Sequence, residues 1–186
     1  MNERPIIFSG PMVRAILAGT KTQTRRVVKP QPMPYARPNE QAMVYGCKQC
    51  PYEVGSFLWV RETWAVDGET VEQARREHED VYVSNTHGPY YRATEVAPDT
   101  LRWRSPIHMP RWASRITLEV TDVLIEHVQD IIEKDAKAEG VSLVSGHPRH
   151  NFRLLWDSIN AKSGCGWNEN PWVWAISFRM RPTVET

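Results

Sequence analysis

The residues best suited to chemistry lie in one short segment that follows a glycine. Lys21 and Thr24 stand three positions apart in the run Gly19-Thr20-Lys21-Thr22-Gln23-Thr24-Arg25-Arg26. A neutral lysine amine can remove the proton of a hydroxyl nucleophile when burial or nearby positive charge lowers the pKa of the lysine. The two arginines supply such charge, so the segment offers a general base and a nucleophile.

The same segment also fits a plainer interpretation, a polar strand edge with a solvated lysine. In an uninterrupted strand, Lys21 and Thr24 point to opposite faces because side chains alternate. The two groups can meet only if the backbone turns or bulges between them. A turn directly after Gly19 would allow this, since glycine often ends a helix.

A second chemical signal lies in the predicted helix 128–139, which ends at Gly140. Its inward stripe combines apolar and acidic residues, namely Ile131, Ile132, Asp135, Ala136 and Glu139. A charge on Glu139 opposes the helix dipole, at a typical cost of about 0.3–1 kcal/mol. A carboxylate at this place indicates a functional role. The alternative is a frayed last turn that leaves Glu139 exposed.

The run from Ile16 to Arg26 resembles the signature of ASCH domains, which is a glycine, any residue, a lysine and, further on, an arginine. ASCH domains are small β-barrels related to the PUA domains that handle RNA and modified bases. Four further pieces resemble prophage-type ASCH proteins and cover much of the remaining chain: 58–64, 109–115, 135–141 and 170–173.

Within this superfamily, the chain looks most like the small bacterial N4-acetylcytidine amidohydrolases. The resemblance implies that Lys21 is the general base, Thr24 the nucleophile, and Glu139 the residue that orients Lys21 or shuttles the proton. The implied substrate is an N4-acylated cytosine nucleoside, and no cofactor or metal is expected. The candidate substrate-binding residues are Arg26, Arg61, Glu62, Trp112 and Arg115.

Two other functions remain open at this stage. The amidohydrolases are much shorter than this chain, which carries insertions at about 29–56 and 66–108. The chain could be a non-catalytic module that binds RNA or a modified base, with arginines on the phosphates. It could also be a ribonuclease that uses the same pocket, because a fold does not define one reaction.

The order of predicted elements favours an α+β fold in a single domain, 1–186, with about three helices and long loop insertions. The resemblance narrows this to a small PUA-like barrel. Helices are predicted from Gly10 to Gly19, at 71–80, at 128–139 and at 150–160. Strands are predicted at 6–8, 20–28, 57–64, 90–94, 116–121 and 172–178.

Composition narrows the partners and the compartment. The formal net charge of +1 excludes a uniformly basic surface, so nucleoside or RNA must bind a local patch. No apolar run approaches the roughly 20 residues that span a bilayer, so no membrane partner is expected. Three cysteines do not suggest a disulfide scaffold, and we expect a cytoplasmic protein. Cys47 and Cys50 have zinc-knuckle spacing but lack a second ligand pair.

Overall fold

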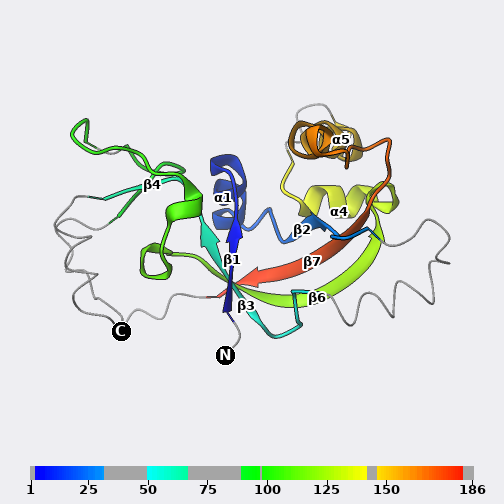
Figure 1. The fold of residues 1–186 in the computed structure, drawn as a ribbon, viewed down its shortest axis with the longest axis horizontal. Helices are drawn as coiled ribbons and strands as arrows, with labels where there is room; N and C mark the ends of the chain where they lie inside the picture. Colours follow the sequence, from blue (N-terminus) through cyan, green and yellow to red (C-terminus); the bar gives the residue numbers. More distant parts are fainter. Residues whose placement is uncertain (1–2, 32–49, 67–88, 97, 142–145, 182–186) are drawn as a thin grey trace.

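The computed structural model describes residues 3–31, 50–66, 89–96, 98–141 and 146–181. The predicted helix 71–80 and Cys47 lie outside these residues, as do large parts of both predicted insertions. The described residues form a mixed α+β structure, as the sequence predicts (Figure 1).

Five strands build the main sheet, in the order β1 (Glu3–Ile7), β3 (Phe57–Arg61), β6 (Thr117–His127), β7 (Trp172–Met180) and β2 (Gln23–Val27). β1 runs parallel to β3, and the other neighbours are antiparallel. β6 and β7 form the long curved floor of the molecule, and the three described helices stand on its concave side (Figure 1).

The two edge strands, β1 and β2, are connected by a side chain. Arg26 on β2 donates from Nη2 to the carbonyl oxygen of Ile7 on β1, at 2.8 Å. Among the described residues, no backbone ladder joins these two edges. The closed barrel that the resemblance implies therefore stays a prediction, and the strands that are described form an open row.

β7 is buried on both faces because different elements cover each face. Trp172, Trp174, Ile176 and Phe178 alternate in sequence and pack into one apolar core with β1, β3 and α1 (Gly10–Leu17). Val173 points the other way and packs with α5 (Pro148–Asn160). A strict alternation of exposed and buried residues is therefore absent from this strand, although the predicted strand itself is confirmed.

The first and last predicted helices are confirmed. α1 begins after Ser9 with proline in its first turn, and Gly19 follows it with a φ of 70°, as a helix-ending glycine does. α5 spans the predicted stripe at 150–160. No helix in the described part of the chain is long and apolar enough to cross a membrane.

The predicted helix 128–139 is wrong in its first half. A 3-10 turn (Val128–Asp130) comes first, and the helix proper, α4, covers only Glu133–Ala138. Arg149 supplies the reason, since it donates to the carbonyl oxygens of Gln129 at 2.8 Å and Ile131 at 3.2 Å. These oxygens are thus bonded outside a helical ladder. As a result Ile131 is buried, whereas Ile132 is 57% exposed.

The predicted strand 57–64 is also divided. β3 ends at Arg61, and the next two-residue strand, β4 (Trp64–Ala65), pairs with β5 (Tyr90–Tyr91) in a separate sheet. The break falls at Glu62, whose side chain is buried and bonded to Arg115. The predicted strands 90–94 and 20–28 are also shorter than expected. The first ends at Tyr91, where a turn follows, and the second, β2, begins only at Gln23.

Candidate functional site

Lys21 lies at the point where the chain leaves α1 and turns toward β2. The backbone N–H groups of Thr20 and Lys21 both donate to the carbonyl oxygen of Ala15, at 2.9 and 3.0 Å. This turn separates Lys21 from the strand and pairs it instead with Glu139 in an isolated β-bridge. The predicted turn after Gly19 is therefore present, and the solvated lysine of the plainer interpretation is wrong, since Lys21 is only 1% exposed.

The Lys21 amine has three oxygen acceptors. Nζ lies 2.8 Å from the carbonyl oxygens of Gln23 and Glu139 and 2.8 Å from Oε2 of Glu139. Burial lowers the pKa of Lys21 below its ordinary value, and the Glu139 carboxylate opposes that decrease. The structure therefore contains a buried lysine whose amine donates a hydrogen bond to a nearby carboxylate.

Glu139 follows the last turn of α4 and is 3% exposed. Its second oxygen, Oε1, lies 3.2 Å from Nη1 of Arg25. The frayed, exposed alternative for this residue is therefore wrong. The carboxylate is buried between the side chains of Lys21 and Arg25.

Arg25 connects this pair to further carboxylates. Its Nη2 lies 2.6 Å from Glu126 on β6 and 3.6 Å from Asp135 on α4. The guanidinium also donates to the side chain of Gln23 at 2.7 Å. Arg25 is 5% exposed, and its ion pairs with the partly exposed Glu126 and Asp135 connect β2, β6 and α4.

Gly140 allows the two chain segments to approach closely. Its φ is +75°, and a Cβ placed there would lie 2.8 Å from the Cβ of Lys21 and 3.0 Å from the Cβ of Ala15. A side chain at this position would therefore push Glu139 away from Lys21. The glycine serves both the helix end and the packing of the site.

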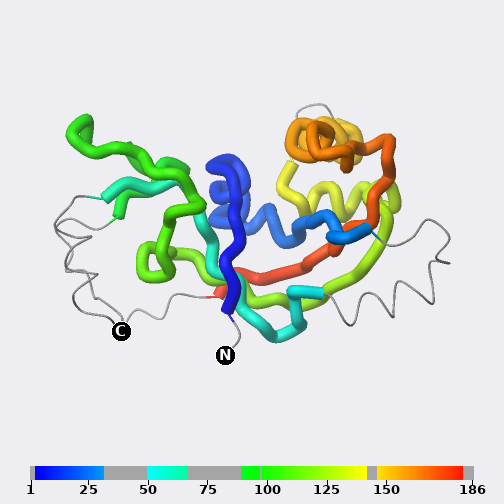
Figure 2. Tube along the Cα trace, viewed as in Figure 1, coloured from blue at the N-terminus to red at the C-terminus, as the bar shows by residue number. Residues whose placement is uncertain are grey.

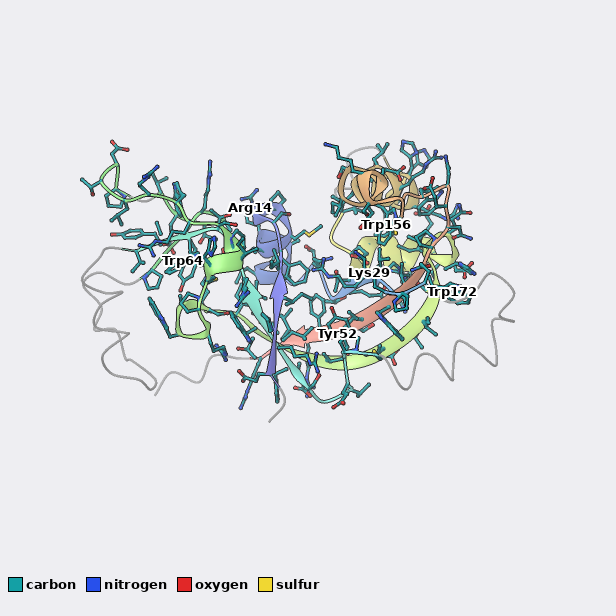
Figure 3. The ribbon with its side chains drawn as sticks, viewed as in Figure 1. Arg14, Lys29, Tyr52, Trp64, Trp156 and Trp172 are labelled. Atoms are coloured by element: carbon teal, nitrogen blue, oxygen red, sulfur yellow. The ribbon has the colours of Figure 1, made fainter. Side chains whose placement is uncertain are left out.

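A cavity of about 340 Å³ opens beside this network. This volume is near the lower end of the range of about 300–1,000 Å³ found for small-molecule pockets. The lining residues come from α1, β2, α5 and the chain before β3: Met12, Thr24, Arg25, Arg26, Val27, Lys29, Tyr52, Glu139, Phe152, Leu155, Trp156, Ile159, Asn160 and Ser163. Figure 3 shows Lys29 between Tyr52 and Trp156.

The cavity explains why two apolar residues on the predicted stripe of α5 are not fully buried. Phe152 and Trp156 are buried, whereas Ile159 is 56% exposed. Leu155 and Ile159 are incompletely buried because both line the cavity instead of packing into the core. Together with Tyr52 they form an apolar and aromatic side opposite charged groups, as in many sites for aromatic ligands.

Four of the sequence-predicted site residues meet at this place. Thr24, Arg26 and Glu139 line the cavity, and Lys21 contacts Glu139 from outside the lining. Within the described residues, no hydrogen bond joins Lys21 to Thr24 and none is made by the Thr24 hydroxyl. The three proposed catalytic residues are thus neighbours, but Lys21 is bonded to Glu139 rather than to Thr24.

The other four predicted substrate-binding residues lie elsewhere and do not line the cavity. Arg115 forms a two-pronged ion pair with Glu62, at 3.0 and 3.2 Å, and covers the ring of Tyr91 at 4.0 Å. Trp112 packs edge-on against Trp64 at 5.9 Å. These contacts connect Arg115 and Trp112 to the residues that follow β3.

Arg61, the last of these four residues, lies over the ring of Trp59 at 4.6 Å and donates to the carbonyl oxygen of Ile107. These contacts place Arg61 among the residues that hold segment 89–115. The substrate-binding role of the four residues Arg61, Glu62, Trp112 and Arg115 stays a prediction.

The cavity wall includes Tyr52 and Lys29, which are not among the site residues that the sequence predicts. Tyr52 and Lys29 lie at the two ends of the proline-rich stretch 29–56, which shows no periodic pattern. Burial raises the pKa of Tyr52, and burial lowers the pKa of Arg26 nearby. The only available signal was the presence of an aromatic residue and a cation in a segment rich in prolines.

The zinc-knuckle spacing of Cys47 and Cys50 is not tested, because Cys47 lies outside the described residues. The Cys50 thiol donates to the carbonyl oxygen of Tyr52 at 3.0 Å. Among the residues that the structure describes, no cluster of three or more histidine, cysteine or acidic side chains could hold a metal ion.

Comparison with known proteins finds two solved structures that align with most of this chain at low sequence identity. No family model matches the chain, and no curated protein matches it. The crystal structure of an ASCH domain from Lactobacillus crispatus aligns with 96% of this chain and 79% of its own, at 10% identity and a TM-score of 0.47. A protein of the DUF984 family model from Enterococcus faecalis aligns with 97% and 80%, at 12% identity and a TM-score of 0.44.

Proposed function

We propose that this chain is an ASCH-type amidohydrolase that removes the acyl group from an N4-acylated cytosine nucleoside. The observation that carries the proposal is the meeting of Lys21, Thr24 and Glu139 beside an aromatic cavity. The motif around Lys21 supports membership of the ASCH superfamily, and the pieces 58–64, 109–115, 135–141 and 170–173 support its prophage-type branch. Tyr52 and Trp156 offer rings on which a pyrimidine can stack.

The proposed reaction proceeds through an acyl-threonine. The Lys21 amine takes the hydroxyl proton of Thr24 while the oxygen attacks the acyl carbon. The carbon–nitrogen bond then breaks, and N4 of the cytosine leaves with a proton that returns through Lys21 and Glu139. Water hydrolyses the acyl-threonine ester, which frees the acid and restores the hydroxyl. Arg26 on the cavity wall faces the negative charge that develops on the acyl oxygen.

The hydrogen bonds of Lys21 set one condition on this reaction. Its three acceptors account for all three protons of an ammonium group, so Lys21 must first lose one proton before it can act as a base. Burial favours the neutral amine, and Glu139 is placed to take the proton.

The same hydrogen bonds favour a second candidate function, binding without hydrolysis. A permanently charged Lys21 would hold Glu139 in place and would not activate Thr24. The cavity would then recognise a modified base or an RNA nucleotide through stacking and hydrogen bonds.

Incubation of the purified chain with N4-acetylcytidine separates these candidates. We expect release of cytidine, followed by chromatography, and a loss of at least about 100-fold in Thr24→Ala and Glu139→Gln. Thr24→Ser should retain activity because it keeps the hydroxyl. Thr22→Ala is the matched control, since Thr22 is exposed in the same segment and should behave as wild type.

Three outcomes would contradict the proposal. Absence of cytidine release in a folded wild-type protein, with tight binding of the nucleoside, would favour the binding module. Full activity in Thr24→Ala would remove the nucleophile assignment. Degradation of RNA that depends on Lys21, without nucleoside hydrolysis, would favour the ribonuclease.

A further inference from the structure

The charges around the cavity do not balance. Four cations, Lys21, Arg25, Arg26 and Lys29, belong to the cavity wall or contact it directly. The carboxylates that pair with them are Glu126, Asp135 and Glu139. The site therefore carries one more positive charge than negative charge.

The excess charge lies on the side of Arg26 and Lys29. All three carboxylates are within 4 Å of Lys21 or Arg25, at distances between 2.6 and 3.6 Å. Among the described residues, neither Arg26 nor Lys29 forms an ion pair. Arg26 instead donates to a backbone oxygen and covers the ring of Phe8 at 5.2 Å.

Lys29 is exposed, yet its backbone is held in place at the cavity. The preceding residue, Val28, is 2% exposed and donates its N–H to the carbonyl oxygen of Trp172 at 3.0 Å. Two residues later, Gln31 donates to Val28 and Trp172 and accepts from the Trp172 N–H at 2.8 Å. The position of this lysine beside the cavity is thus determined by ordered neighbours on both sides.

We infer that the cavity takes a phosphorylated nucleoside, with Lys29 contacting its phosphate. This inference rests on the proposed function, because it assigns the substrate class of the same site. A phosphate monoester supplies the negative charge that the wall lacks, and a lysine amine is a strong phosphate ligand. The base then contacts the aromatic side of the cavity, which Tyr52 and Trp156 line. A neutral nucleoside would leave the excess charge uncompensated.

Calorimetric titration tests the phosphate contact without depending on catalysis. Cytidine is compared with its 5′- and 3′-monophosphates at low salt. We expect one of the monophosphates to bind about 10- to 100-fold more tightly than cytidine, the range for a charge-assisted contact. The preference should decrease with added salt, because Lys29 is exposed and such charges are screened.

Two lysine variants decide whether Lys29 is responsible. Lys29→Ala should reduce the preference for the monophosphate to less than about threefold. Lys134→Ala removes the same charge from an exposed position on α4 that does not line the cavity, and it should keep the preference. Equal binding of cytidine and both monophosphates would overturn the inference, as would an unchanged preference in Lys29→Ala.

The outcome is separable from that of the proposed reaction. A protein that prefers the monophosphate but releases no acyl group from N4-acetylcytidine or its phosphate would keep this inference and lose the hydrolase. A protein that hydrolyses the nucleoside and its monophosphates equally well would lose only the inference. If the protein binds a short RNA oligonucleotide but neither monophosphate, the inference of a nucleotide site is wrong and the cavity recognises RNA.

Discussion

At the scale of single residues, the site depends on a lysine and a glutamate that are 118 positions apart in the chain. Two buried ionisable groups are costly to desolvate and are retained only when they are paired and hydrogen-bonded. Lys21 and Glu139 meet both conditions, and Arg25 adds a second cation to the carboxylate. The same arrangement allows a proton to move between the amine and the carboxylate, which the proposed reaction needs.

The half-buried Tyr91 leads to a prediction about how the stability of the protein depends on pH. Burial raises the pKa of Tyr91 to about 12, and its hydroxyl donates to the carbonyl oxygen of Ala113 at 2.9 Å. The unfolded chain loses this proton near pH 10. The folded state therefore holds more protons between pH 10 and 12, and stability falls as the pH rises through that window, by at most about 3 kcal/mol.

Denaturant unfolding at several pH values measures this effect. Tyr91→Phe should have a smaller decrease in unfolding free energy between pH 10 and 12 than the wild type. Tyr90→Phe leaves the Tyr91 hydroxyl in place and should show the wild-type slope. Identical slopes in all three proteins would contradict the assignment to Tyr91.

At the scale of elements, the site exists because α4 is short and ends at the right place. A continuous helix 128–139 would have carried Ile132 inward, but this residue is exposed and the helix begins only at Glu133. Because α4 ends at this place, Glu139 lies beside the turn that follows α1. Gly140 completes the approach, since its missing side chain leaves room for Lys21.

Replacement of this glycine tests the close approach. Gly140→Ala should destabilise the protein by about 1–2 kcal/mol for the left-handed backbone and by about 1–3 kcal/mol more for the clash with Lys21. Gly164→Ala is the matched control, because its φ of +71° is similar and nothing lies within 4 Å of the added Cβ. Equal losses of unfolding free energy in the two variants would show that the close packing at Gly140 does not contribute to stability.

At the scale of the whole molecule, β7 is the element that joins the parts of the fold. It pairs with β6 on one side and β2 on the other, and its two faces contact two different apolar clusters. The site lies at one edge of this sheet, where β2 meets α5. Figure 2 shows the chain following this path, with the C-terminal strand beneath the N-terminal helix.

Native-state hydrogen exchange checks this central role. The amides of β7 should exchange among the slowest in the described chain, because opening them requires separation from both neighbouring strands. The amides of β4 and β5 should exchange much sooner, since each of these strands has only two residues. Equal protection in both sheets would contradict this order.

The sequence by itself determined several features of the molecule. The helices α1 and α5, the glycine after α1 and the strand β7 depend on local chemistry, and the structure confirms them. The position of Glu139 on an inward face was also visible, because a carboxylate among apolar residues departs from the local pattern. These features were predictable since each involves neighbours along the chain.

Only the tertiary structure decided which distant groups meet. Arg149 interrupts the predicted helix by bonding carbonyl oxygens some 18 to 20 positions away. The cavity wall joins Lys29, Tyr52 and Trp156, which no spacing relates. Glu62 and Arg115, in contrast, pair with each other away from this cavity. Long-range contacts of this kind depend on how elements pack, and packing is a property of the folded chain rather than of any single segment.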